Sequence, residues 1–450
     1  MSIQIKKSLS FLNSLKKIPL AADAVDCLFS AKSFKAEILT LIEKAQKRIY
    51  LTALYLEADE AGKDILLALH QAKRKNPDLD IVVCIDFHRA QRGLIGQKKP
   101  TETNASWYQE VEKAEGLGIK ILGVPVKRKE LFGVQHLKGF IFDNKVLYSG
   151  ASFNNIYLHQ EDRYRYDRYW LIDSPKLANS MVEFLKTVIV ASDAVVSLNA
   201  EVIPKISSFK MKQKSFSKNL KQASYRFEGE DISTQLSVTP LCGLGIRKNA
   251  LNKCIRKILQ SSEKKLVIFT PYFNLPNVLA RDLSAALNRG VKLTIVIGDK
   301  TANDFYIPKE RPFKTIGALP YLYETNLKRF TEKHYDALQS GQIKLHLWKS
   351  DANSFHLKGI YADERFVLLT GHNLNPRAWR LDIENALLID DPKKSLQGLL
   401  DKELSEILKN TLQITTPEQI DNIDDYPAKV QKILRRLRRF KADRIIKGLI

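Results

Sequence analysis

The sequence has few cysteines and no pattern that would hold a metal. Only four of its 450 residues are cysteine, and none of them forms a C-x-x-C pair. They are scattered singly among apolar neighbours: Cys27, Cys84, Cys242 and Cys254. This distribution is typical of reduced core cysteines rather than of disulfides or a metal site. Because no cluster of His, Asp and Glu has a metal-ligand pattern either, the sequence predicts neither a metal nor another cofactor.

Long apolar runs and targeting signals are also missing. No run approaches the roughly 18 residues that span a bilayer. The N-terminus places lysines among Ser and Asn, without the apolar region and cleavage site of a signal peptide. We therefore expect a cytoplasmic protein.

Acidic residues are also few in comparison with basic residues. Lys and Arg number 72 against 50 Asp and Glu, which gives a formal net charge of +22. Such a charge attracts a polyanion, which could be nucleic acid, an acidic membrane surface or a phosphate-rich substrate. Charge alone does not choose among these partners.

One motif is written twice in the chain. Residues 135–143 (QHLKGFIFD) return as residues 355–363 (FHLKGIYAD) with the key residues in register. Only two of the eight histidines, His136 and His356, open an H-x-K pattern, and in both copies four residues separate the lysine from an aspartate. One copy would be weak evidence of a site, whereas two copies are strong evidence.

The surrounding pattern indicates that a whole α/β unit is duplicated. Arg48 precedes Lys265 by 217 residues and His136 precedes His356 by 220, so corresponding residues of the two halves are separated by nearly the same interval. Apolar strands alternate with amphipathic helices in both halves, which favours a parallel or mixed sheet covered on both faces. The predicted strands are 48–55, 79–86 and 119–126 in the first half, and 265–272, 291–297 and 343–349 in the second.

We therefore predict an α/β fold of two α/β/α sandwich halves with a segment before, between and after them. The segment between them, 204–235, is rich in Lys and Ser and is typical of a mobile connector or a solvated helix. The predicted divisions are a basic N-terminal segment 1–30, a first half 31–203, the connector 204–235, a second half 236–414 and a basic tail 415–450.

The duplicated motif carries residues suited to phosphoryl transfer. In a strand, residues two apart share a face, so His136 and Lys138 point together, as do His356 and Lys358. The aspartates Asp143 and Asp363 point to the other side, and we expect them to fix the strand or a nearby loop.

Each motif is followed by a turn of small residues and then by a carboxylate. The turns end in Asn154 and Asn375, which could hydrogen-bond an oxyanion. Asp167 and Glu384 follow at matching positions and are candidates to hold the histidines' Nδ1–H, which would leave Nε2 free to attack phosphorus. Two facing halves would supply a nucleophile, an acid/base and two cations. The alternative is that the motifs lie on solvated strand ends and the duplication is merely architectural.

The doubled H-x-K-x4-D pattern with its Gly/Asn turns resembles the phospholipase D superfamily. Segments along nearly the whole chain are similar to one of its families, the enterobacterial type of CDP-diacylglycerol--serine O-phosphatidyltransferases. In the second copy the interval from Asp363 to Gly371 is one residue longer than the first copy's, which keeps the family spacing. The resembling segments are 53–57, 86–93, 148–152, 270–276, 298–306 and 371–380.

The resemblance implies two phospholipase D-like halves related by a pseudo-twofold axis, with the active site at their interface. It implies that CDP-diacylglycerol and L-serine react, without metal, to phosphatidylserine and CMP through a phosphatidyl-histidine. We expect His136 to be the nucleophile and His356 the acid and then the base, because the family usually uses its first copy for attack. The order is not decided by the residues themselves.

Basic residues after the second strand of each half are candidates for binding the diphosphate or cytidine end. They are Arg89, Arg92, Lys300 and Thr301, and they could equally be ordinary surface residues.

The tail 426–450 has apolar residues at helical spacing and a basic opposite face. We expect this helix to bind the anionic inner face of the cell membrane peripherally, through residues that include Arg435, Arg436, Arg438 and Arg439. The alternative is a helix packed on the second half with its charges solvated.

Two other functions stay open. One keeps the superfamily but changes the acceptor, as in a cardiolipin synthase, a phospholipase D or a nuclease. Nucleases of this family commonly carry one motif per chain, and the familiar bacterial cardiolipin synthases begin with membrane-spanning helices. The other is a basic RNA- or ribosome-binding protein, for which no recognised module stands out, so nucleic-acid binding at low salt is expected to be secondary.

Overall fold

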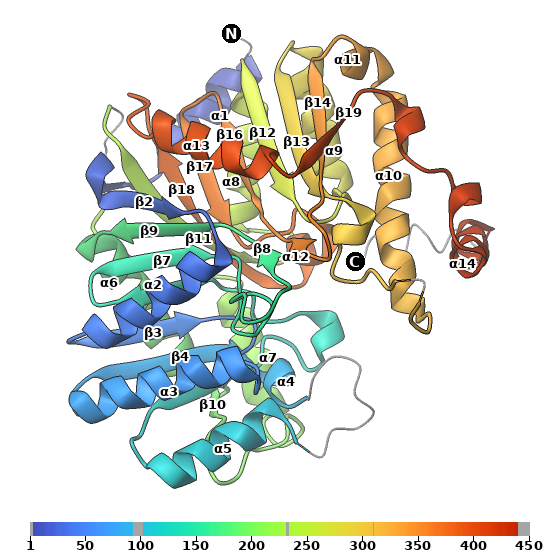
Figure 1. Ribbon diagram of the computed structural model, residues 1–450. Coiled ribbons are helices and arrows are strands. Elements are labelled where there is room, and N and C mark those ends of the chain that lie inside the picture. Colours follow the sequence, from blue (N-terminus) through green and yellow to red (C-terminus); the bar gives the residue numbers. More distant parts are fainter. Residues whose placement is uncertain (1–2, 93–101, 231–233, 309, 440–450) are drawn as a thin grey trace.

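The computed structural model describes residues 3–92, 102–230, 234–308 and 310–439. Within these residues the chain forms two large mixed sheets, one in each half (Figure 1). The first sheet has the order β10 (Val196–Ser197), β5 (Lys120–Val124), β4 (Asp80–Asp86), β3 (Arg48–Thr52), β6 (Gly139–Phe142), β7 (Lys145–Ser149), β9 (Tyr169–Asp173), β2 (Val25–Leu28).

The second sheet repeats the order of the first. In both sheets three neighbouring strands are parallel, a short antiparallel strand (β10 or β19) lies outside them, and the motif strand joins them antiparallel on the other side. Its order is β1 (Ile18–Pro19), β11 (Ser237–Leu244), β18 (Ile383–Asp390), β17 (Phe366–Thr370), β16 (Gly359–Ala362), β12 (Lys265–Thr270), β13 (Lys292–Gly298), β14 (Ile343–Trp348), β19 (Thr411–Ile414). The repeated order confirms the predicted duplicated α/β fold.

Helices cover both faces of each sheet, because each carries an apolar face at helical spacing. In Figure 1, α2 and α3 lie across the first sheet, and α8 and α9 lie behind the second. The first half has α2 (Ala31–Lys44), α3 (Glu60–Lys75), α4 (Phe87–Ala90), α5 (Asn104–Glu115) and α6 (Pro175–Phe184). The second half has α8 (Ala250–Ser261), α9 (Asn277–Asn288), α10 (Leu319–Lys333), α11 (Tyr335–Gln339), α12 (Pro376–Arg380) and α13 (Gln397–Leu408).

The two halves share one hydrophobic core. Each half has an outer core of its own between a sheet and its outer helices. A third cluster combines side chains of both halves, such as Tyr148 and Trp170 from the first and Phe269 and Leu357 from the second. The inner faces of the sheets, with α6 and α13, are therefore buried together rather than solvated.

The predicted N-terminal and connecting segments are built into this core. Helix α1 (Ile3–Asn13) packs on α8, while β1 joins the second sheet and β2 the first, so the segment 1–30 joins both halves. Of the two forms predicted for the connector, the structure has a helix, α7 (Lys210–Leu220), rather than a mobile linker. Its Phe216 and Leu220 are buried in the shared core because they lie on one helical face.

The C-terminal helix α14 (Ala428–Arg439) packs on the second half, as the alternative prediction had it. Val430 and Leu434 are buried against Tyr321 and Leu322 of α10, together with Tyr426. The apolar stripe is therefore covered by protein, and membrane binding through the basic face stays a prediction. The opposite face leaves described basic residues exposed: Lys429, Lys432, Arg435, Arg436 and Arg439. The Arg438 side chain and residues 440–450 lie outside what the structure describes.

None of the helices in the described ranges is long and apolar enough to cross a membrane.

Candidate active site

Both copies of the motif lie where the two halves meet. The four motif side chains, which are His136, Lys138, His356 and Lys358, are all buried. They directly precede β6 and β16, so each stands at the end of a strand at the centre of its sheet.

Each motif segment is hydrogen-bonded to the opposite half. The His136 N–H donates to the Ile383 carbonyl at 3.0 Å, and the His356 N–H donates to the Tyr166 carbonyl at 2.7 Å. A short parallel pair, β8 (Arg165–Tyr166) and β15 (Ser354–Phe355), extends the second contact. Backbone pairing between the halves therefore fixes how the motifs face each other.

Each motif histidine pairs with a carboxylate from the opposite half, so the carboxylates are exchanged between the halves. Oε2 of Glu384, from the second half, lies 2.9 Å from Nδ1 of His136 in the first. Oδ2 of Asp167, from the first half, lies 3.0 Å from Nδ1 of His356 in the second. A carboxylate that accepts the Nδ1–H of an imidazole leaves Nε2 free as a nucleophile or base. Neither half contains a complete histidine–carboxylate pair of its own.

The glycine turn that follows each motif also contacts the opposite half. A Cβ on Gly371 would lie 2.8 Å from Cγ of Lys138, and a Cβ on Gly150 would lie 2.9 Å from Nζ of Lys358. Each turn thus lies directly against the lysine of the other half. Only glycine gives the backbone this close approach.

The motif aspartates face away from the histidines. Each has a positive φ, 51° at Asp143 and 53° at Asp363. The carboxylate of Asp143 accepts the N–H groups of residues 46–48 at 2.8–3.0 Å, and that of Asp363 accepts those of residues 263–265 at 2.8–2.9 Å. They hold the chain at the start of the neighbouring strand.

The two asparagines order the turns that follow the motifs. Oδ1 of Asn154 accepts the Tyr157 N–H at 3.0 Å, and its amide donates to Glu57 at 2.9 Å. Oδ1 of Asn375 accepts the Ala378 N–H at 2.9 Å. Contact of either asparagine with a substrate oxyanion stays a prediction.

Two residues that the sequence did not single out hold the lysine backbones. The amide of Asn385 accepts the Lys138 N–H and donates to the Lys138 carbonyl, both at 2.8 Å. Arg168 donates to the Lys358 carbonyl at 3.0 Å and pairs with buried Glu403 at 3.0 Å. Their positions, directly after Glu384 and Asp167, were readable, but an Asn and an Arg at matching places gave no shared chemical signal.

The site is not symmetric. The third residue after Asn154 is Tyr157, whose hydroxyl lies 2.9 Å from Nδ1 of His356. The third residue after Asn375 is Ala378, so the surroundings of His136 have no such hydroxyl at the matching place. The two histidines therefore have different neighbours in an otherwise repeated frame.

Burial and neighbouring charges shift the pKa values of Lys138, His356 and Asp167. Burial and the nearby Lys358 lower the pKa of Lys138 to about 7, and they lower the pKa of His356 to about 4. Although burial opposes it, the charge of Lys358 and the hydrogen bond with His356 lower the pKa of Asp167 to about 2. Asp167 is thus ionised and His356 neutral near pH 7.

The pKa values of His136 and Glu384 are both shifted in the direction that favours their neutral forms. Burial lowers the pKa of His136 well below 6.5, with Lys138 adding to the effect. Burial and Asp382 raise the pKa of Glu384 well above 4.5. Attack by Nε2 of His136 requires an ionised Glu384 and the ring proton on Nδ1, so the pair must first lose one proton.

The predicted substrate-binding residues have partners in the protein. Arg89 and Arg92 pair with Glu130 at 2.7 and 3.2 Å. Lys300 pairs with Glu324 at 3.0 Å and with Asp421, and Thr301 donates to Asp299 at 2.6 Å. The structure does not bring them into contact with the four motif side chains, and their binding of substrate stays a prediction.

Among the residues that the structure describes, no three His, Cys, Asp or Glu side chains gather in a group that could hold a metal ion.

The chain is similar to known proteins over nearly its whole length. The family model described as "Cardiolipin synthase, PLD-like domain" matches the chain twice, at residues 38–188 and 255–408, which are the two halves. The chain is 47% identical to the CDP-diacylglycerol--serine O-phosphatidyltransferase PssA of Escherichia coli (strain K12), over 98% of this chain and 97% of that protein. It is 45% identical to the protein of that name from Haemophilus influenzae, over 99% of each chain. The crystal structure of the H. influenzae phosphatidylserine synthase matches with a TM-score of 0.97 and 44% identity, over 99% of this chain and 100% of that one.

Nδ1 of His356 contacts both Asp167 and Lys358, and we expect the ionised carboxylate rather than the lysine to set the tautomer of the ring. Long-range ¹H–¹⁵N spectra of ¹⁵N-histidine-labelled protein should show His356 neutral, with its proton on Nδ1, down to about pH 4. In Asp167→Asn the ring should change to the Nε2–H form, because an amide in that place can donate to Nδ1. His346, which lies in β14 against Thr411, serves as the unaffected reference. An Nε2–H ring already present in the unchanged protein would contradict this assignment.

Proposed function

The chain belongs to the phospholipase D-like family, in the group of the CDP-diacylglycerol--serine O-phosphatidyltransferases, and from this membership we propose that it makes phosphatidylserine. The reaction transfers the phosphatidyl group of CDP-diacylglycerol to L-serine and releases CMP. The observation that supports the mechanism is the exchange of carboxylates, which sets Nδ1 of each histidine against a carboxylate of the other half, beside two buried lysines.

In the first step, Nε2 of His136 attacks the phosphorus of the phosphatidyl group. A P–N bond forms and the P–O bond to CMP breaks, which leaves a phosphatidyl-histidine. Lys138 and Lys358 neutralise the charge on the non-bridging oxygens, where it builds up in the transition state. Glu384 stabilises the imidazolium that forms. CMP leaves as a phosphate anion and needs little help from an acid.

In the second step, His356 takes the proton from the serine hydroxyl as its oxygen attacks phosphorus. The P–N bond breaks, His136 is regenerated and the configuration at phosphorus is retained overall. The low pKa of His356, about 4, leaves this ring neutral at pH 7, which is the form in which it can act as the base. Asp167, ionised beside it, stabilises the imidazolium.

The histidine roles are tested by single-turnover assays with labelled CDP-diacylglycerol in detergent micelles. His136→Asn should release no CMP and trap no adduct, with at least about 10³-fold loss of rate. His356→Asn should still release about one CMP per enzyme in a burst and hold the phosphatidyl group, because serine then lacks its base. A burst in the His136 variant but not in the His356 variant would reverse the roles.

The same assay separates the proposed activity from its alternatives. L-serine, glycerol 3-phosphate, phosphatidylglycerol and water are offered as acceptors, and product formation with serine should dominate. Transfer mainly to water would indicate a phospholipase D, and transfer to phosphatidylglycerol a cardiolipin synthase. Added chelator should leave the rate unchanged, since two lysines supply the positive charge at the reacting centre.

The depressed pKa of Lys138 predicts an alkaline limb in the pH profile. The lysine must be protonated to hold phosphate oxygens, and a group with pKa lowered to about 7 loses that form as the pH rises. The kcat/KM for CDP-diacylglycerol, which reports the free enzyme, should fall about tenfold per pH unit above this value. In Lys138→Arg the limb should vanish, because arginine stays charged at these pH values. A limb unchanged in that variant would assign it to another group.

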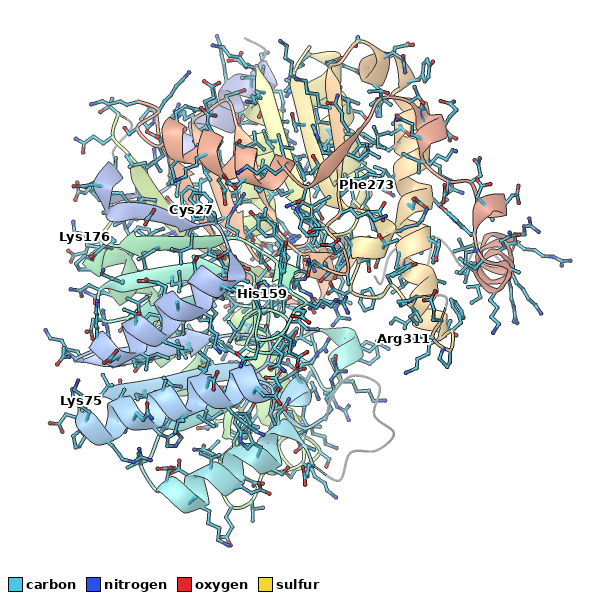
Figure 2. All side chains as sticks on the ribbon, viewed as in Figure 1. Cys27, Lys75, His159, Lys176, Phe273 and Arg311 are labelled. Atoms are coloured by element: carbon cyan, nitrogen blue, oxygen red, sulfur yellow. The ribbon has the colours of Figure 1, made fainter. Side chains whose placement is uncertain are left out.

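We also propose that the protein binds the anionic inner face of the cell membrane without inserting α14. The apolar stripe of this helix is buried against α10, so only its basic face is available. In Figure 2 the side chains of α14 extend outward from the edge of the molecule. Because each basic residue near an anionic surface contributes roughly 1 kcal/mol, this face can contribute through charge alone.

Sedimentation with phosphatidylglycerol vesicles at low salt tests this surface. Changing Arg435, Arg436 and Arg439 to Glu should weaken binding by on the order of 100-fold or more while micellar activity stays intact. The matched control changes three exposed lysines of α7 to Glu, which alters the net charge equally: Lys212, Lys214 and Lys218. An equal loss in the control would show that overall charge, not α14, directs binding. Retention of RNA instead of vesicles by the unchanged protein would favour the nucleic-acid alternative.

A further inference from the structure

An ion pair that the proposed mechanism does not use lies beside His356. Nε of Arg165 is 3.2 Å from Oδ1 of Asp304, and the two residues come from opposite halves. Arg165 is in β8, which pairs with β15 directly before His356. Asp304 follows β13, in the segment 298–306 that resembles the family but received no role above.

Each member of the pair is joined to His356 by one tyrosine. The guanidinium of Arg165 lies 4.8 Å from the ring centroid of Tyr157, whose hydroxyl is 2.9 Å from the histidine. The Tyr272 hydroxyl donates to Oδ2 of Asp304 at 3.0 Å, and its ring lies edge-on to the His356 ring at 6.3 Å. Both charges are thereby fixed close to the proposed base.

The pair keeps unused hydrogen-bonding capacity. Nε of Arg165 donates to Ser354, but its two terminal nitrogens donate to no residue in the described part of the chain. Oδ1 of Asp304 is buried and accepts no hydrogen bond from the described residues, since its contact with Arg165 has poor hydrogen-bond geometry. A buried acceptor left in this state is costly unless a ligand or water completes it.

The pair is nevertheless partly exposed to solvent. The side chains of Arg165 and Asp304 are 12% and 15% exposed, whereas Lys358 is fully buried. On the His136 side, the nearby ion pair of Arg377 and Asp382, both from the second half, lies 3.0 Å apart, and the Asp382 carboxylate also accepts the Val134 N–H. Within the described residues, the pair beside His356 differs from it in joining the two halves and in keeping an acceptor oxygen without a hydrogen bond.

We propose that Arg165 and Asp304 select the acceptor of the proposed reaction by binding its α-carboxylate and α-ammonium groups. This inference rests on the proposed function and concerns only its second step. Serine is a zwitterion, so one fixed cation and one fixed anion beside the base match its two charges while its hydroxyl faces His356. An acceptor with one charge would leave one member of the pair unmatched in a desolvated site, which is how binding sites reject such analogues.

The test compares each residue with the substrate group that it is proposed to bind. In Asp304→Asn the KM for L-serine should rise about 10- to 100-fold, whereas the low transfer to glycerate, which lacks the ammonium group, should not fall further. In Arg165→Gln the loss should again appear with serine but not with ethanolamine, which lacks the carboxylate. Arg163→Gln changes an exposed arginine two residues before β8; it is the matched control and should behave as the unchanged protein.

The burst of CMP without serine distinguishes failure of the proposed function from failure of the proposed acceptor site. Its amplitude and the KM for CDP-diacylglycerol should be unchanged in both variants. If the unchanged protein shows neither burst nor serine transfer, the proposed function fails. If serine transfer is present but the variants raise the KM for CDP-diacylglycerol and leave that for serine unchanged, the pair belongs to the donor site and the inference is overturned.

A measurement on the unchanged protein keeps the inference testable should a variant not fold. L-alanine, which has both charges but no hydroxyl, should compete with serine, whereas ethylamine and propionate at equal concentration should not. Equal inhibition by all three compounds, or by none, would overturn the inference.

Discussion

The exchange of carboxylates between the halves is the interaction on which the rest of the structure depends. Two lysines and two carboxylates are buried together with two histidines at one junction. A buried charge without its partner costs several kcal/mol, and here each partner of a histidine comes from the other half. Separating the halves would therefore leave ionisable groups unpaired on both sides, and the shared core adds an apolar penalty to the same separation.

Much of this arrangement could be predicted because the chain is a repeat. The motif residues have the same spacing in both copies, the asparagines and the carboxylates Asp167 and Glu384 follow them in the same order, and strand periodicity indicates which residues share a face. The exchange itself could not be predicted, because a sequence interval does not tell whether a carboxylate turns to its own histidine or to the other one. Asn385 and Arg168 were missed for a related reason: they support equivalent carbonyls with different chemistry.

The segments outside the repeat were harder to interpret for a different reason. Composition made the connector basic and serine-rich, yet α7 is fixed in the shared core by two side chains, Phe216 and Leu220. In α14 the spacing of the apolar residues predicted a helix correctly but could not identify what covers it, since a lipid surface and α10 accept the same stripe. In both cases the missing information was the tertiary partner.

A duplicated frame gives two equivalent sites, whereas the proposed two-step transfer needs two different ones. The difference is made by a few substitutions at matching places, of which Tyr157 against Ala378 is the clearest, because it gives a hydroxyl to one histidine only. The strands, the glycine turns and the lysines stay equivalent, since in the proposed mechanism they hold the same phosphate in both steps. Symmetry is thus kept where the proposed chemistry is shared by both steps and lost around His356, the proposed base for the acceptor. The ion pair of Arg165 and Asp304 lies on this side, which is where the proposed selection of an acceptor requires it.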